Sequence, residues 1–140
     1  MVPLYTDPVR VARINNEIPQ YRESKRANIA CKKAIENLLA ERFDGMRLHG
    51  DCAKELCDEF GTDRVGWVLA STVQHFSWDG RFRHHNKLWA DEFLIPTDPD
   101  DRTTDYCVNY HPEIVNGLID QYREYVQTLD EENEHDIELC

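Results

Sequence analysis

Two groups of residues in this sequence have types and spacings that could support catalysis or metal binding. Ser71 and His75 are four residues apart, so on one helix the imidazole would lie within reach of the hydroxyl. Cys107 and His111 are also four apart, and they could bind a metal together with a histidine of the pair His84–His85. Neither spacing matches a recurrent motif, and no glycine-rich loop accompanies the serine. The sequence therefore favours a protein that is not an enzyme and needs no metal or other cofactor.

A polar and aromatic turn in the middle of the chain offers a recognition surface instead. Trp78, Asp79 and Arg81 lie within four residues of one another, and Trp89 follows in the next predicted helix. The simpler interpretation is that Asp79 and Arg81 form an ion pair that braces the turn. Because tryptophan and arginine are common anchors of protein interfaces, these residues are also candidates for binding a partner.

Acidic residues are concentrated in the last third of the chain. The protein has a formal net charge of −11, and residues 97–140 contain thirteen acidic and only two basic residues. Such a surface repels nucleic-acid phosphate and is attracted to basic grooves of proteins. The alternative is an acidic face and tail that only keep the protein soluble. The candidate partner-binding acids are Asp98, Asp100, Asp101, Asp105, Glu131 and Glu132.

Helical periodicity dominates the sequence and should position these residues. A central helix is predicted over residues 62–76, where apolar residues recur at helical spacing and Thr62 and Asp63 form the start. Pro19 should end a short first helix that begins near Pro8. The other helical patterns span residues 21–43, 51–60, 84–93 and 112–126.

One segment has the alternating pattern of a strand. Residues 106–110 alternate in polarity and could pair with residues 93–95 in a hairpin. The sequence therefore predicts a mostly α fold, a compact bundle of about five helices with at most one short β-hairpin. It forms a single domain over residues 1–128, and an acidic, flexible tail follows over residues 129–140.

Asn28 is unusual because it lies on the inner face of the long helix predicted over residues 21–43. The simpler interpretation is a core amide whose hydrogen bonds are satisfied by neighbouring groups. The alternative is a ligand contact, in which Ser24 and Asn28 converge with Asp79 and Arg81 on a pocket for a small molecule or a nucleotide.

The cysteines and the apolar segments indicate the compartment. The five cysteines are odd in number and form no Cys-x-x-Cys pair, so reduced thiols are expected. No apolar run approaches the roughly 20 residues of a membrane span. The N-terminus also lacks the features of a secretory signal. We expect an intracellular protein with no membrane contact.

A series of short motifs lies in order between residues 21 and 90. They are Tyr21-Arg22-Glu23-Ser24, Asn28, Cys31, Ile35, Asp44-Gly45, Phe60-Gly61, Arg64-Val65, Val68-Leu69-Ala70, Trp78-Asp79-Gly80-Arg81-Phe82 and Asn86-Lys87-x-Trp89-Ala90. Together these motifs resemble an uncharacterised domain family found in phages and other mobile elements of anaerobic gut bacteria. The resemblance covers about residues 4–126 and brings no catalytic assignment.

This resemblance implies a setting in which small acidic proteins often inhibit host defence. Together with the acidic last third, it leads us to expect a non-enzymatic, anti-CRISPR-like inhibitor in the cytoplasm of the bacterial host. The expected partner is a host defence protein with a basic groove, bound without direct contact with nucleic acid. The alternative is a module of mobile-element proteins that binds a small molecule or a nucleotide.

Overall fold

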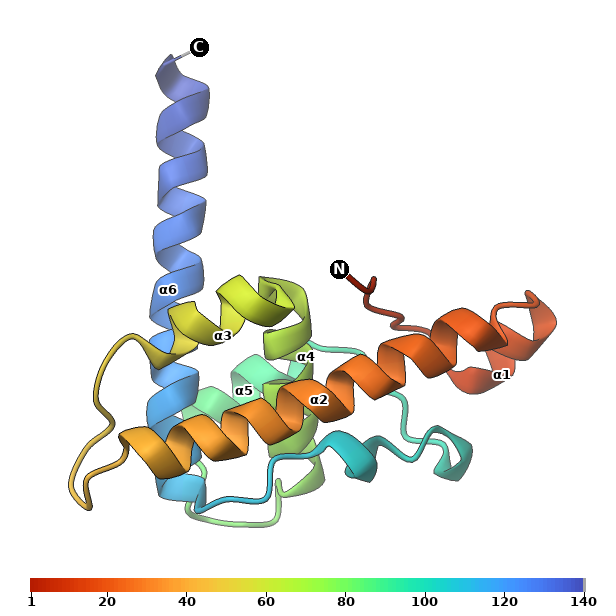
Figure 1. Ribbon diagram of the computed structural model, residues 1–140, viewed down its shortest axis with the longest axis horizontal. Coiled ribbons are helices and arrows are strands. Elements are labelled where there is room, and N and C mark those ends of the chain that lie inside the picture. The colour runs from red at the N-terminus through yellow and green to blue at the C-terminus, as the bar shows by residue number, and fades with distance from the viewer. Residues whose placement is uncertain (140) are drawn as a thin grey trace.

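A buried helix, α4 (Thr62–His75), passes through the middle of the computed structural model and carries much of its core (Figure 1). Every residue from Arg64 to Val73 is buried, so this part of the helix has no solvent face. A helix surrounded on all sides is typical of the centre of a helical domain. The structure describes the backbone of residues 1–139 and the side chains of residues 1–131.

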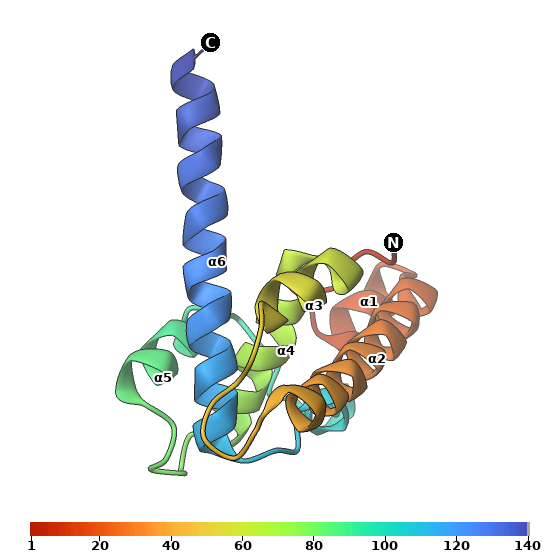
Figure 2. The ribbon, with the colours of Figure 1, turned by 60° about the vertical axis from the view of Figure 1, so that its left-hand side comes forward.

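The other helices surround α4. In Figure 2, α2 lies on one side of α4, α5 and α6 lie on the other, and α3 bridges α2 and α6. The mostly α prediction is confirmed, with six α-helices over the described residues instead of about five. The remaining elements are α1 (Val9–Ile14), α2 (Ile18–Arg42), α3 (Cys52–Phe60), α5 (His84–Asp91), α6 (Pro112–Leu139) and two 3-10 turns, η1 (Pro99–Asp101) and η2 (Thr103–Tyr106).

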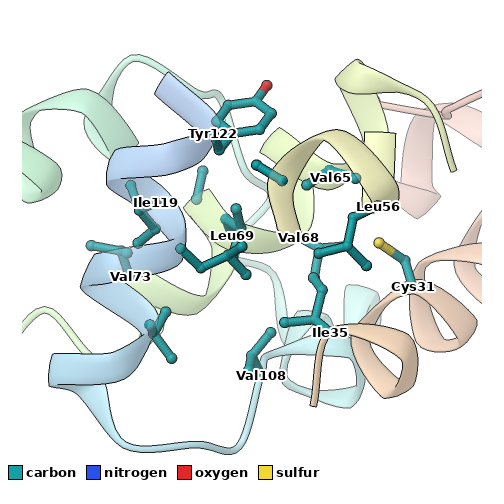
Figure 3. Close-up of a cluster of buried hydrophobic side chains, with 14 of the residues drawn as sticks. Cys31, Ile35, Leu56, Val65, Val68, Leu69, Val73, Val108, Ile119 and Tyr122 are labelled. Carbon is teal, nitrogen blue, oxygen red and sulfur yellow. The ribbon is translucent and has the colours of Figure 1, made fainter. Parts of the chain in front are cut away.

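The core forms where α4 meets its two neighbours. Figure 3 shows Val65, Val68 and Leu69 of α4 between Ile35 of α2 and Ile119 of α6. These five side chains are fully buried. Burial of each such side chain contributes about 1.5–3 kcal/mol to folding. The apolar contacts between these three helices therefore stabilise the body of the molecule.

Pro19 lies in the first turn of α2 and does not end the preceding helix, contrary to the prediction. The first helix, α1, has already ended at Ile14, and Asn16 adopts a left-handed conformation with φ of 58°. Pro19 then lies in the first turn of α2, where its missing N–H has no helical partner to lose.

Helices α4 and α6 approach each other closely at Gly66. A Cβ atom at this position would lie 2.2 Å from the Tyr122 hydroxyl oxygen. That hydroxyl donates a hydrogen bond to the Thr62 carbonyl at 3.0 Å, which joins α6 to the first turn of α4. A side chain at position 66 would therefore overlap the Tyr122 ring, and glycine avoids this overlap.

The predicted β-hairpin is not formed. In the described part of the chain no strand occurs, and the single isolated bridge joins Phe43 and Leu48. The Val108 N–H donates to Thr72 Oγ1 at 2.9 Å, and the Asn109 N–H donates to a Glu36 carboxylate oxygen at 2.6 Å. Side chains of α4 and α2 therefore accept the backbone hydrogen bonds of Val108 and Asn109, which a partner strand would otherwise accept.

The C-terminal half of α6 projects away from the other helices (Figures 1 and 2). Tyr122, Tyr125 and Val126 still contact the core. The helix continues to Leu139, past residue 128, where the sequence predicts the domain to end. The flexibility of residues 129–140 stays a prediction, since the description of side chains ends at Glu131. None of the helices described has both the length and the apolar character needed to cross a bilayer.

Candidate functional site

The acidic loop that contains η1 and η2 lies against the basic residues of α1 and α2. The Arg10 guanidinium is 3.4 Å from the Asp98 carboxylate. Lys25 Nζ is 3.2 Å from Asp105 Oδ2, and Arg13 is 4.0 Å from Asp100. The pairs of Arg10 and Arg13 are exposed and contribute about 0–1 kcal/mol each. All three pairs offset part of the negative charge of the loop. Three predicted partner-binding acids therefore face basic groups of their own chain.

Asp101 is a buried residue, with 2% of its surface exposed. Its Oδ1 accepts hydrogen bonds from the Val9 N–H at 2.8 Å and the Tyr21 hydroxyl at 3.2 Å. These hydrogen bonds join the loop to α1 and α2. Because Asp101 is buried, its carboxylate is not available to a protein partner.

The predicted acidic residues lie in two separate regions. Figures 1 and 2 show that the loop with η1 and η2 lies beneath α1 and α2, whereas the end of α6 projects away from the body. Glu131 is exposed on that projecting part. The side chain of Glu132 lies outside the described residues. The last third of the chain therefore does not form one continuous acidic surface.

The ion pair predicted in the aromatic turn is present. Asp79 Oδ1 accepts hydrogen bonds from the Arg81 backbone N–H at 2.9 Å and from Arg81 Nε at 3.1 Å. Arg81 Nη2 donates to Asp79 Oδ2 at 2.8 Å. The guanidinium lowers the pKa of Asp79 from its ordinary value of 3.8 to about 2. This geometry favours the structural interpretation, in which the pair braces the turn.

The two tryptophans predicted as interface anchors differ in environment. Trp78 is 77% exposed, whereas Trp89 is half-buried. The Trp89 ring packs edge to face on Phe93, with centroids 5.1 Å apart, and on Tyr122, with centroids 5.7 Å apart. Trp89 therefore serves the packing of α5 on α6, and Trp78 is the tryptophan of this pair that a partner could contact.

An amide network that the sequence analysis missed holds the aromatic turn on α6. The Asn116 amide donates to the Arg81 carbonyl at 2.8 Å, and its oxygen accepts from the Asn86 amide at 3.0 Å. Both asparagines are fully buried. Because each amide finds partners, the turn is held in one position on the helix.

Ser24 and Asn28 come together around a buried arginine that sequence reasoning also missed. Arg64 is 3% exposed. Its Nε donates to Asn28 Oδ1 at 2.8 Å, and its Nη2 donates to Ser24 Oγ at 3.1 Å. The backbone carbonyls of Val2 and Pro3 accept from Nη1 at 2.6 Å and Nη2 at 3.1 Å. Every acceptor of this guanidinium is neutral, and burial lowers the pKa of Arg64.

The four residues of the alternative ligand pocket do not line one common space. Ser24 and Asn28 border a small cavity of about 20 Å³ beneath the N-terminal segment. Arg81 borders a separate open groove of about 560 Å³ with Phe43 and Tyr110. Asp79 is bonded to Arg81 on that second side. The structure therefore divides this set into two pairs.

Two of the residues that suggested catalysis or metal binding, Ser71 and Cys107, are engaged elsewhere. The buried Ser71 hydroxyl donates to the Trp67 carbonyl at 2.7 Å, not to His75. The Cys107 thiol donates to the Ser71 and Thr103 carbonyls at 3.5 and 3.4 Å, and burial raises its pKa to about 12. A raised thiol pKa disfavours the thiolate that nucleophilic attack or metal binding requires. Over the residues described, no three His, Cys, Asp or Glu side chains are grouped closely enough to hold a metal ion.

Comparison with known proteins identifies the family. A family model described as "Protein of unknown function (DUF3849)" matches residues 4–127, so the chain belongs to this family. No curated protein and no solved structure matches the chain. The matched region ends next to Val126, which among the side chains described on α6 is the last one that packs on the core. The family domain therefore comprises the helical body, and the projecting part of α6 extends beyond it.

Proposed function

We propose that this member of the DUF3849 family is a non-enzymatic inhibitor that binds a nucleic-acid-binding effector of a host defence system. The observation that supports this function is the projecting part of α6, which extends free of the body (Figure 2). Residues 127–140 contain six acidic residues and no lysine or arginine. A rod with this charge would fit a basic groove that normally holds phosphate.

The pairing of the other acids points to α6 as the docking element. Asp98, Asp100 and Asp105 lie close to basic side chains of α1 and α2, so they offer little net charge to a partner. Asp130 and Glu131 lie beyond Val126, on the part of α6 that leaves the body. The host-defence role and the bacterial cytoplasm as its site follow from the mobile-element setting that the sequence resemblance implies.

The test is capture of a partner from host lysate with the protein as bait. We expect a basic protein that is retained at low salt, released as the salt concentration rises, and eluted by added double-stranded DNA. Its retention should be lost when Asp130, Glu131 and Glu132 are replaced together by lysine, because the attraction then becomes repulsion.

A control variant distinguishes the effect of the α6 charges from the effect of the net charge of the protein. Replacing Asp91 and Glu92, two exposed residues at the end of α5, and Glu59 of α3 by lysine changes the net charge by the same amount. This variant should retain the partner. Equal loss of retention in both variants, or capture that DNA does not reverse, would contradict the proposed function.

A further inference from the structure

Three basic side chains form a stripe on the outer face of α2, here called the basic stripe. Arg22 and Arg26 are four residues apart and Lys33 follows seven residues later, so the three lie on one side of the helix. All three are exposed. Ala30, which is also exposed, lies between Arg26 and Lys33, and its short side chain leaves room for a partner.

The positive charge of the basic stripe is not offset by ion pairs, although acidic residues outnumber basic ones by 27 to 16 in this protein. Other cations of the same helix are paired. Lys25 Nζ lies 3.2 Å from Asp105 Oδ2. Lys32 Nζ lies 3.8 Å from Glu36 Oε2. Among the side chains that the structure describes, the three residues of the stripe form no such pair.

The acidic end of α6 matches the basic stripe in length and is opposite to it in charge. Residues 127–140 contain six acidic residues and no lysine or arginine. Asp130 and Glu131 are exposed on this end. At about 1.5 Å per residue, α6 is about 18 Å long from residue 127 to Leu139, and the stripe is about 16 Å long from Arg22 to Lys33. The two segments could therefore pair along their whole length.

Within one molecule these two segments do not meet. Figures 1 and 2 show that the end of α6 projects away from the body, and that α2 and α6 lie on opposite sides of α4. The acidic end that could cover the stripe must therefore come from another molecule. A second copy of the chain supplies such an end.

We propose that the basic stripe of α2 binds the acidic end of α6 from a second copy of this chain. Two such contacts related by a two-fold axis close a dimer, in which the end of each α6 lies on α2 of the other copy. Nucleic acid is the less favoured occupant, because the net charge of −11 repels phosphate. Two copies also repel each other at a distance, but salt screens this repulsion beyond about 8 Å, whereas the contact itself joins opposite charges.

This inference does not rest on the proposed function. The contact occupies the same end of α6 that the proposed function assigns to an effector, so the two contacts exclude each other. Reversing the charges of α2 alone removes the contact between copies and leaves the acidic end of α6 intact. That variant should therefore still capture the effector, which distinguishes failure of this inference from failure of the proposed function.

The test exchanges the charges of the two segments and follows the mass of the purified full chain by sedimentation velocity at high micromolar concentration. The first variant carries Arg22→Glu, Arg26→Glu and Lys33→Glu, and the second carries Asp130→Lys, Glu131→Lys and Glu132→Lys. The wild type should be a dimer. Each variant alone should be a monomer, because each contact then joins like charges.

An equimolar mixture of the two variants should restore the dimer. In the mixed dimer, the lysines of one α6 meet the glutamates of α2, and the acidic end of the other α6 meets an unchanged basic stripe. A change in net charge alone cannot produce this rescue, since both variants remain negatively charged overall. Circular dichroism verifies that each variant is folded before the mixture is made.

A control variant changes the net charge without touching either segment. Replacement of the exposed residues Glu59, Asp91 and Glu92 by lysine gives the same charge change as the α6 variant, and this protein should stay a dimer. A monomeric wild type, a dimer that persists in either segment variant, or a mixture that stays monomeric would overturn the proposal. Binding of duplex DNA by the wild type that is lost in the α2 variant would assign the stripe to nucleic acid and would overturn it as well.

Discussion

Arg64 explains the most unusual feature of α2, which is the polar inner face of its first half. The buried guanidinium needs acceptors, and Ser24 and Asn28 supply two of them. The sequence placed these residues correctly on the inner face and identified a satisfied amide as the simpler interpretation. It did not identify Arg64 as their partner, because an arginine in the first turn of a helix is usually exposed. The pairing depends on contacts between residues 36 and 40 positions apart.

Replacing Arg64 by methionine should lower the free energy of unfolding by about 3 kcal/mol, because four acceptors lose their donor. Adding Ser24→Ala and Asn28→Leu to this variant should recover part of the loss, since two of those acceptors are then removed. Urea unfolding measures both effects. The exposed Arg26→Met variant is the control and should stay within about 0.5 kcal/mol of the wild type.

Asp79 should make the stability of the protein depend on pH in the acid range. Its pKa is lowered to about 2 by Arg81, so the ion pair stabilises the folded state fully above the unfolded pKa of about 4. This contribution is lost as the pH falls from about 4 to about 2. Asp79→Asn should therefore reduce the pH dependence of the unfolding free energy in that window. Parallel curves for the variant and the wild type would contradict this assignment.

At the scale of elements, helix positions follow from the sequence better than the contacts between helices do. The central helix was predicted over residues 62–76 and spans Thr62–His75. The predicted hairpin is absent because the side chains of Thr72 and Glu36 accept the backbone hydrogen bonds that the carbonyl groups of a partner strand would otherwise accept. The close approach of α4 and α6 at Gly66 could not be predicted from the sequence either, because it depends on contact with Tyr122, which lies far away along the chain.

Gly66→Ala should destabilise the protein by about 1–3 kcal/mol, because its Cβ would collide with the Tyr122 hydroxyl. Adding Tyr122→Phe should restore part of that loss by removing the oxygen. Gly117 on α6 is the matched control, since nothing lies within 4 Å of an added Cβ. Gly117→Ala should stabilise α6 by about 0.5–1 kcal/mol. Thermal unfolding would contradict this account if both glycine variants behaved alike.

At the scale of the whole molecule, the charges are divided between a paired loop and a projecting helix. The composition predicted the acidic last third, but not that Arg10, Arg13 and Lys25 would cover its first part. That arrangement depends on the tertiary fold. The family match ends at residue 127, so the projecting acidic part belongs to this chain and not to the family domain.

Reversing the charges of Asp98 and Asp100 should affect folding and leave partner binding unchanged. The new lysines would face Arg10 and Arg13, so we expect a loss of up to about 1 kcal/mol per pair, which shrinks as salt is added. Unfolding in low and high salt measures the loss. A fall in partner capture without a fall in stability would instead place these acids in the interface.

The central claim is that α6 occupies a groove meant for nucleic acid. The most direct measurement is competition for the captured effector between this protein and labelled DNA, followed by fluorescence anisotropy. We predict that the wild-type protein displaces the DNA, and that the Asp130, Glu131 and Glu132 lysine variant needs at least about ten times more protein, a difference of about 1.4 kcal/mol. Equal displacement by both proteins would contradict the claim.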